Sequence, residues 1–220
     1  MGKSNFNIIS INVGKPQKLN HRGEQIWTGI QKEPISKPIF LSKLNFDGDG
    51  QADTIHHGGF DKAVCVYSFE HYLYWEKELN ITLDLGAFGE NLTIEGLTEN
   101  MVHIGDIFQM GEAIVQVSQP RQPCHKLAKR YNLKDLPVRF QNTGFTGFYF
   151  RVLKEGIVEK NTRCSLIEAD RLAISIEFAN QIMHHEKDNQ EAIKQILKVN
   201  ALSDSWRQTF EKRLKGSEMD

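Results

Sequence analysis

The chain changes character near residue 165. Before that point, short runs rich in β-branched and aromatic residues alternate with turns that contain glycine, proline or asparagine. Residues 171–220 contain a single glycine and no proline. Many short strands separated by turns are typical of a barrel or a sandwich, whereas apolar stripes at helical spacing are typical of amphipathic helices. The pattern predicts a mostly β domain with some α-helix over residues 1–166 and a small three-helix domain over residues 167–220.

The predicted strands end at turn signals. They cover residues 6–13, 25–30, 38–46, 63–67, 91–95, 107–110, 113–117 and 145–153. Two helices interrupt them, from about residue 68 to 79 and from 123 to 131. In the last part, Ser175 and Ser203 each precede a helical stripe, Asp188 and Glu191 form a capping-box-like pair, and Gly216 is the expected helix end.

Composition narrows the functional class. The formal net charge is -1 and hydrophobic residues make up 40% of the chain, so we expect a globular protein without the basic surplus that binds a nucleic-acid polymer. No apolar run approaches 18 residues and no secretory signal is visible, so we expect no membrane span and a cytoplasmic location. Three cysteines without a CxxC pair indicate free thiols in a reducing compartment.

The segment around Cys124 carries the strongest chemical signal. It reads Ser-Gln-Pro-Arg-Gln-Pro-Cys-His-Lys from residue 118 to 126, so prolines stiffen the approach to the cysteine. Cys124 is expected in the first turn of a helix, close to the cations of Arg121, His125 and Lys126, and this setting favours a thiolate. A thiolate is a soft metal ligand or a nucleophile. An inert packing cysteine is the alternative interpretation, and the residues alone do not decide between the two.

A second segment, residues 56–64, reads His-His-Gly-Gly-Phe-Asp-Lys-Ala-Val. Gly58 and Gly59 allow close approach of the backbone to a ligand, and their N–H groups can hold an anion beside His57 or Lys62. An ordinary glycine-rich turn is the alternative. Asn91, in Gly-Glu-Asn-Leu-Thr, and Arg22, in His-Arg-Gly, are weaker candidates for binding a polar ligand and a phosphate. Cys65 and Cys164 are predicted to pack in the interior.

Three motifs, in this order, resemble the MOSC family, named for the C-terminal domain of molybdenum-cofactor sulfurase. They read HHGGFDKAVCVYS, GAFGENLTIEGL and IGDIFQMGEAIVQVSQPRQPC. The chain resembles most the YiiM-type bacterial branch, linked to resistance against 6-hydroxylaminopurine, in which a small three-helix domain follows. The resemblance covers almost the whole chain, and the cysteine motif is its most specific part.

The resemblance implies a β-barrel with short helices and a bound molybdenum cofactor (molybdopterin), with Cys124 as the protein's molybdenum ligand. The implied activity is reductive dehydroxylation of N-hydroxylated purine bases, amidoximes and hydroxylamines, which detoxifies base analogues. Electrons would come from a separate flavoprotein reductase, because the chain has no G-x-G-x-x-G dinucleotide fingerprint.

Within this framework the cofactor's phosphate is assigned to basic side chains and glycine-loop N–H groups. His57, Asp61 or His125 would supply protons, beside Cys124 in the catalytic set. The full cofactor-binding set is Arg22, His56, His57, Gly58, Gly59, Lys62, Asn91, Arg121 and Cys124.

Two other functions are compatible with the same residues. The chain could carry or sense the cofactor without turning over a substrate, or it could use Cys124 as a nucleophile with no metal and His57 or His125 as the base. The three-helix tail is a candidate surface for docking the reductase or for pairing two chains as a homodimer.

Overall fold

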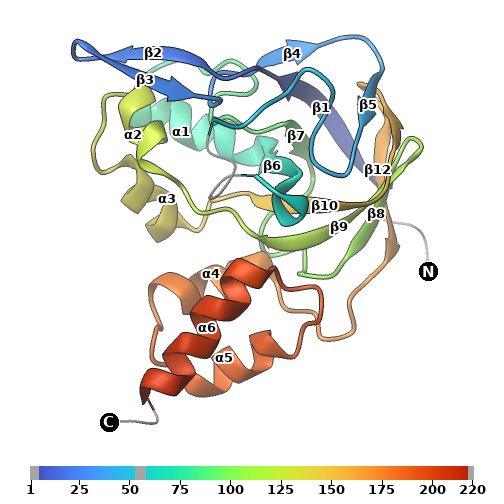
Figure 1. The fold of residues 1–220 in the computed structure, drawn as a ribbon, viewed down its shortest axis with the longest axis vertical. Helices are drawn as coiled ribbons and strands as arrows, with labels where there is room; N and C mark the ends of the chain where they lie inside the picture. The colour runs from blue at the N-terminus through green and yellow to red at the C-terminus, as the bar shows by residue number, and fades with distance from the viewer. Residues whose placement is uncertain (1–4, 53–57, 218–220) are drawn as a thin grey trace.

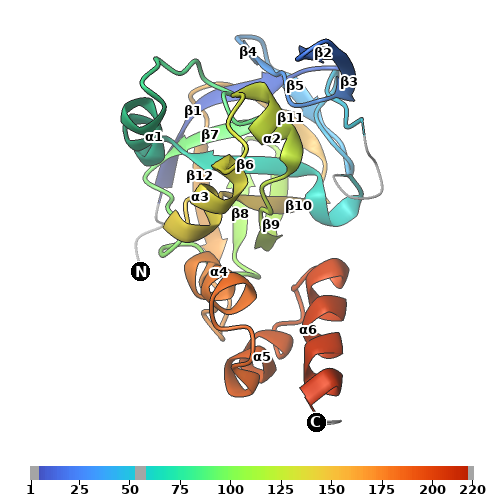
Figure 2. The same cartoon turned by 90° about the vertical axis from the view of Figure 1, so that its left-hand side faces the viewer.

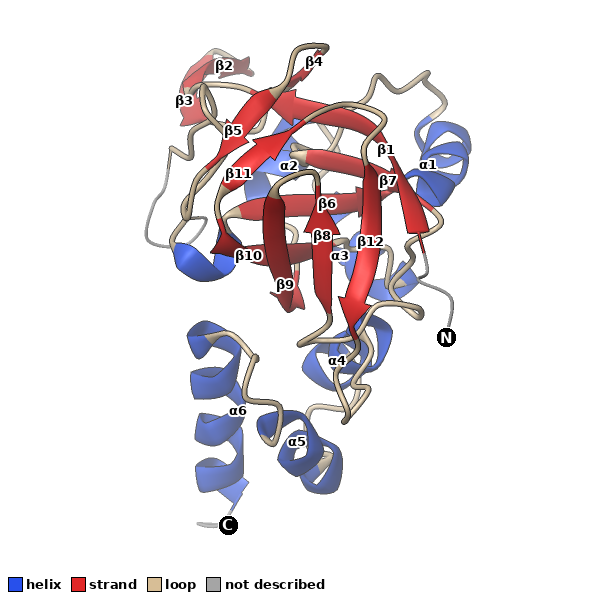
Figure 3. Ribbon diagram, turned by 90° about the vertical axis from the view of Figure 1, so that its right-hand side faces the viewer, coloured by secondary structure: helices blue, strands red, loops and turns tan. Residues whose placement is uncertain are grey.

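The structure, a computed structural model, describes residues 5–52 and 58–217. Its centre is a closed β-barrel of seven strands in the order β12-β8-β9-β10-β6-β7-β1, closed by pairing of β12 with β1. Figure 3 shows this ring, in which every pairing is antiparallel except that of β6 with β7. The strands are β1 (Asn5–Val13), β6 (Val64–Ser68), β7 (Leu92–Glu95), β8 (Ile107–Met110), β9 (Ala113–Pro120), β10 (Phe148–Lys154) and β12 (Arg163–Glu168).

Five short strands lie outside this ring. A β2–β3 hairpin (Gln17–His21 and Glu24–Thr28) projects from the barrel (Figure 1), β4 (Glu33–Ile35) extends the far end of β1, and β5 (Ile39–Leu41) pairs with β11 (Gly156–Val158). The predicted strand over 38–46 is therefore wrong beyond Leu41, because the chain turns where the Ser42 N–H donates to the Asn45 carbonyl. Strands β2, β4, β11 and β12 were not predicted.

Three helices lie over one side of the barrel (Figure 2): α1 (Tyr72–Leu79), α2 (His125–Arg130) and α3 (Leu136–Thr143). They enclose an aromatic cluster that is separate from the barrel interior, in which Trp75 and Phe140 stack with ring centroids 4.2 Å apart. Phe88 contacts both rings from the loop before β7. This cluster fixes the loop that carries Phe88, and that loop forms one wall of the site described below.

The last helices are α4 (Ile176–His184), α5 (Gln190–Leu197) and α6 (Asp204–Ser217), which form the expected three-helix tail at one end of the barrel (Figure 1). Ser175 caps α4 as predicted, since its hydroxyl accepts from the Phe178 N–H at 3.0 Å. The cap of α5 is Asn189 and not the predicted Asp188, and α6 continues through Gly216. Apolar side chains of all three helices join the barrel's own core cluster. The predicted domain boundary at residue 166 falls inside β12, which ends at Glu168.

No helix in the described part of the chain has both the length and the apolar character needed to cross a bilayer.

Candidate anion-binding cavity at Cys124

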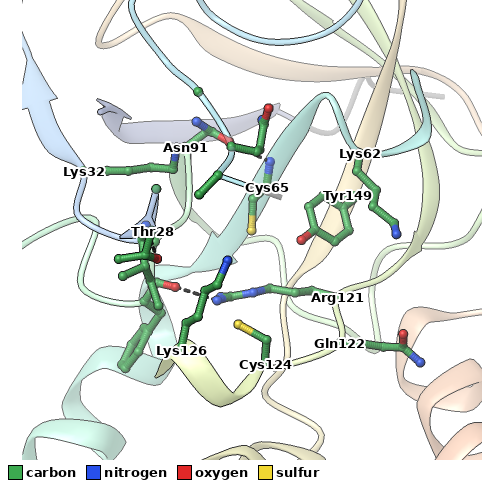
Figure 4. Close-up of a pocket in the computed structure, with 17 residues that line it drawn as sticks. Thr28, Lys32, Lys62, Cys65, Asn91, Arg121, Gln122, Cys124, Lys126 and Tyr149 are labelled. Atoms are coloured by element: carbon green, nitrogen blue, oxygen red, sulfur yellow. Dashed lines mark hydrogen bonds between the residues drawn. The ribbon is translucent and has the colours of Figure 1, made fainter. Parts of the chain in front are cut away.

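A cavity of about 620 Å³, including the part open to solvent, lies between the barrel wall and the α2 region. Its walls come from the end of β3, residues 50–52, β6, the loop before β7, the β9–α2 connection and β10. Figure 4 shows side chains from these separate segments converging on one space.

The cavity is electropositive. Four of its lining residues are cations, namely Lys32, Lys62, Arg121 and Lys126, and no carboxylate is among the described lining residues. Lys32 is paired just behind the wall with the fully buried carboxylate of Asp49, which offsets its charge. The cations of Arg121 and Lys126 make this cavity suited to a negatively charged ligand.

Arg121 is the central cation of the cavity. It is 6% exposed, its backbone N–H donates to the Gly147 carbonyl at 3.0 Å, and its Nη2 donates to the Phe88 carbonyl at 2.5 Å. Its Nη1 is buried and finds no hydrogen-bond partner among the described residues. A buried charged donor without an acceptor lowers the free energy of unfolding. An anion that accepted a hydrogen bond from this nitrogen would remove that cost.

The Phe88 carbonyl is held in place by Glu90, a fully buried carboxylate. Glu90 accepts the backbone N–H groups of Phe88 at 3.0 Å and Gly86 at 3.2 Å, and the hydroxyls of Tyr72 and Thr93. Gly89 completes the turn with φ of 82°, and a Cβ there would meet the Ile30 side chain at 2.8 Å. Glycine is thus required by both backbone conformation and space.

Cys124 lines the cavity and is half-buried. It is the residue immediately before α2, with an extended backbone at φ of −105° and ψ of 165°, so the predicted place in the first helical turn is wrong by one residue. The difference arises because Pro123 belongs to the extended connection and does not start the helix. Of the three cations predicted around the sulfur, Arg121 and Lys126 line the cavity with it, while His125 is exposed and outside the lining.

Cys65 also lines the cavity, although it was predicted only to pack. Val64 and Val66 point into the barrel core, whereas Cys65 lies on the opposite face of β6. In Figure 4 the Arg121 side chain lies between the sulfurs of Cys65 and Cys124. Burial raises the pKa of the Cys65 thiol, an effect that nearby Arg121 opposes, and Tyr149 lines the same cavity. The alternation of side chains along a strand was the signal that could have revealed this position.

Asn91 lines the cavity, but its amide group already holds protein groups. Its Oδ1 accepts the Cys65 N–H at 3.0 Å, and its Nδ2 donates to Asp49 Oδ2 at 2.8 Å. The Asp49 carboxylate in turn binds Lys32 and the Gly14 N–H. Asn91 therefore ties three segments of the cavity wall together, and the buried Asp49–Lys32 pair was missed because the two residues lie in separate loops.

Several predicted site residues lie elsewhere. Arg22 is at the tip of the β2–β3 hairpin, where its Nε donates to Asn132 Oδ1 at 3.0 Å, and it does not line the cavity. The Asp61 carboxylate binds Arg151 Nη2 at 2.7 Å and the Asp204 N–H at 3.1 Å, at the junction with the tail. Neither side chain is brought to Cys124.

The glycine-rich segment contributes less to the lining than the sequence suggested. Gly58 and Gly59 precede the 3-10 turn Phe60–Lys62 (η1), and only Lys62 of this segment is among the described lining residues. His56 and His57 lie outside the described residues.

Two family models match the chain. The MOSC domain model matches residues 53–165, and the model described as YiiM-like, 3-alpha helix domain matches residues 174–216.

Individual proteins agree with these matches. The chain is 51% identical over 213 residues to the uncharacterized protein YflK of Bacillus subtilis, covering 97% of this chain and 96% of that one. It is 38% identical to protein YiiM of Escherichia coli, with 84% of each chain covered. A protein named Reductase from Gibberella moniliformis is 35% identical over 73% of this chain, which spans only 29% of that longer protein.

The crystal structure of YiiM from Geobacillus stearothermophilus superposes with a TM-score of 0.82 at 47% identity. The match covers 95% of this chain and 99% of that one. The barrel and the tail therefore have a common arrangement in both proteins.

Proposed function

Because the chain belongs to the MOSC family, in the branch that carries the YiiM-like three-helix domain, we propose that it is a molybdenum-cofactor-dependent reductase of N-hydroxylated compounds. MOSC domains generally bind this cofactor. The substrates we propose are N-hydroxylated purine bases such as 6-hydroxylaminopurine, amidoximes and hydroxylamines. The proposal rests above all on the buried Arg121 Nη1, which lacks a partner among the described residues in a cationic cavity that also holds a cysteine.

The cavity fits the cofactor in two respects. Its cations suit the cofactor's phosphate, and Cys124 offers a soft sulfur to the metal. We assign Cys124 as the molybdenum ligand, and Arg121, Lys62 and Lys126 as the groups that neutralise the negative charge of the bound cofactor. Cys65 is a weaker candidate for the metal, because its burial favours the neutral thiol.

The bound cofactor would supply the two-electron chemistry that removes the hydroxyl oxygen from nitrogen, with electrons from a separate flavoprotein reductase. That reaction releases water and consumes two protons. Of the predicted proton donors, Asp61 and His125 do not line the cavity, while His57 lies outside the described residues. Tyr149 and Cys65 both line the cavity, and burial raises the pKa of each, so each keeps its proton at neutral pH and can donate a hydrogen bond to a bound oxygen. We propose this pair as the group that orients the substrate's hydroxyl.

The test compares the two cavity cysteines. Cys124→Ser and Cys65→Ser are purified from a host that makes the cofactor, and molybdenum is measured by mass spectrometry together with reduction of 6-hydroxylaminopurine by a flavoprotein reductase system. We expect Cys124→Ser to lose molybdenum and activity while its unfolding curve stays that of the wild type. Cys65→Ser should keep its molybdenum. A Cys124→Ser protein that retains metal and activity would refute the ligand assignment.

The same experiment separates the alternatives. A carrier or sensor of the cofactor would retain molybdenum in the wild type yet reduce no N-hydroxylated substrate. A metal-free cysteine enzyme would be active without molybdenum.

Three free thiols are consistent with a reducing compartment, and the cytoplasm is the location we propose.

A further inference from the structure

Asp61 makes a set of contacts that join the barrel to the tail. Its carboxylate receives Arg151 Nη2 of β10 at 2.7 Å through one oxygen, and the Asp204 N–H at the start of α6 at 3.1 Å through the other. Its backbone carbonyl accepts the Ser118 hydroxyl of β9 at 2.5 Å. One residue of η1 is thus bonded to two barrel strands and to the tail.

The tail adds parallel contacts at the same place. The segment 201–205, which we call the tail junction, places the Ala201 carbonyl 2.9 Å from Arg151 Nη2 and the Ser203 N–H 3.0 Å from the Ser118 carbonyl. The Ser205 hydroxyl donates to Gln119 Oε1 at 3.2 Å. The tail junction therefore contacts both η1 and the end of β9.

These two segments carry cations of the cavity. Lys62 follows Asp61 directly in η1, and Arg121 follows Gln119 by two residues. A shift of η1 moves the Lys62 backbone with it, because the two residues share one short 3-10 turn. The contacts of Asp61 therefore contribute to the position of the Lys62 backbone in the cavity wall.

We propose that Asp61 is a positioning residue through which the three-helix tail sets the position of Lys62 in the anion-binding wall of the cavity. This inference rests on the proposed function, since it gives the tail a part in binding the cofactor's phosphate. Binding free energies are reciprocal, so an anion in the cavity also strengthens the attachment of the tail.

The test measures the affinity of the full-length protein, produced without cofactor, for inorganic phosphate by calorimetry. Asp61→Asn keeps the size of the side chain but loses the ion pair with Arg151. Loss of the negative charge alone would strengthen phosphate binding, so the about fivefold weaker binding that we expect, as is typical of coupled sites, would report the displacement of Lys62. Asp61→Glu should restore part of the affinity. In a Lys62→Met background, Asp61→Asn should have no further effect, because the residue acts through Lys62.

Arg207→Met is the matched control. Arg207 donates to the Leu197 and Val199 carbonyls inside the tail and to none of the junction partners of Asp61 and Arg151. Its loss should lower the free energy of unfolding, while the folded protein keeps the junction contacts and therefore its phosphate affinity. The inference is overturned if Asp61→Asn binds phosphate as the wild type does, if its effect persists in the Lys62→Met background, or if the wild type binds no phosphate. If the wild type contains molybdenum but Asp61→Asn has the phosphate affinity of the wild type, only this inference is refuted. If the phosphate affinities change as expected but the wild type never contains molybdenum, only the proposed function is refuted.

Discussion

At the scale of single residues, Arg121 is expected to lower the stability of the protein without ligand and to favour the binding of an anion. Its guanidinium is buried and makes one side-chain hydrogen bond, to the Phe88 carbonyl, while Nη1 has no partner among the described groups. Folding a cation into such a place is costly unless a ligand compensates. The residue is therefore better explained by what it binds than by what it stabilises.

We predict that Arg121→Gln weakens phosphate binding about tenfold or more, since a hydrogen bond to a charged group contributes about 1.5–3 kcal/mol. The urea midpoint of the protein without cofactor should stay unchanged or rise, because an unpaired buried charge is removed. Calorimetry and urea unfolding measure the two effects. Arg139→Gln, in an exposed ion pair on α3, is the control and should leave phosphate affinity unaltered. Lower stability with unchanged affinity in Arg121→Gln would contradict the anion role.

Single residues also show how far the sequence could lead. Cys124 and Arg121, which the sequence grouped together, line the same cavity, and the role of Cys124 as a metal ligand stays a prediction. Lys32 and Tyr149 were missed because they are brought to the cavity from segments far apart in the chain. A local sequence pattern does not predict that these two residues line one cavity, because their proximity depends on closure of the barrel.

At the scale of elements, the loop before β7 forms one wall of the cavity, and the buried carboxylate of Glu90 holds its backbone in place. The Glu90 carboxylate gathers two backbone N–H groups and two hydroxyls, and thereby sets the carbonyl that receives Arg121. The turn is irregular, so its backbone groups have no ladder partners and need this side chain.

We expect Glu90→Gln to lower the free energy of unfolding by about 1–3 kcal/mol, because an amide NH2 would face donors and leave a buried N–H unsatisfied. Urea unfolding provides the measurement. Glu95→Gln, an exposed site on β7 whose partner is Asn7, should change stability by less than about 0.5 kcal/mol. Equal midpoints for the two variants would show that Glu90 does not organise the loop.

Elements with a regular apolar pattern were predictable, and others were not. The runs that became β1, β6 and β8 were located to within one residue, because each buries alternate side chains in the core. Strand β2, with the sequence Gln-Lys-Leu-Asn-His, lies in a hairpin outside the barrel and has no buried face that would impose alternation. The cap of α5 was misplaced by one residue because Asp188 and Asn189 are both competent caps, and the helix register decides between them.

At the scale of the whole molecule, barrel and tail share one apolar core, so their stabilities are coupled. His184 is the last residue of α4. It is half-buried, and its Nε2 has no hydrogen-bond partner among the described residues. Desolvation, with a smaller contribution from His185 and Arg213, lowers the pKa of His184 to about 4.

This pKa predicts how folding stability depends on pH. Between pH 6.5 and about 4 the unfolded chain binds a proton at His184 more readily than the folded chain. The contribution of neutral His184 to the free energy of unfolding is therefore fully present above pH 6.5, and it is lost as the pH falls through this window. We expect a loss on the order of 1 kcal/mol after solvent screening. His184→Gln should remove this part of the dependence in urea unfolding at pH 7.5 and pH 5. His185→Gln, at an exposed site, should retain most of it, because desolvation of His184 is the larger cause of the shift. Identical pH profiles for wild type and His184→Gln would exclude this role.

The pairing of β12 with β1 has a consequence for synthesis on the ribosome. Strand β1 can complete its pairing only after β12 has been synthesised. Asn5 of β1 pairs with Ser165 of β12, and nearly the whole barrel sequence lies between these two residues. Until residue 168 leaves the exit tunnel, β1 and β8 each present an unpaired edge that another nascent chain can join. Codons that slow translation at the end of the barrel or in the first part of the tail would prolong this exposed interval, because β12 is still inside the exit tunnel while those tail residues are being added.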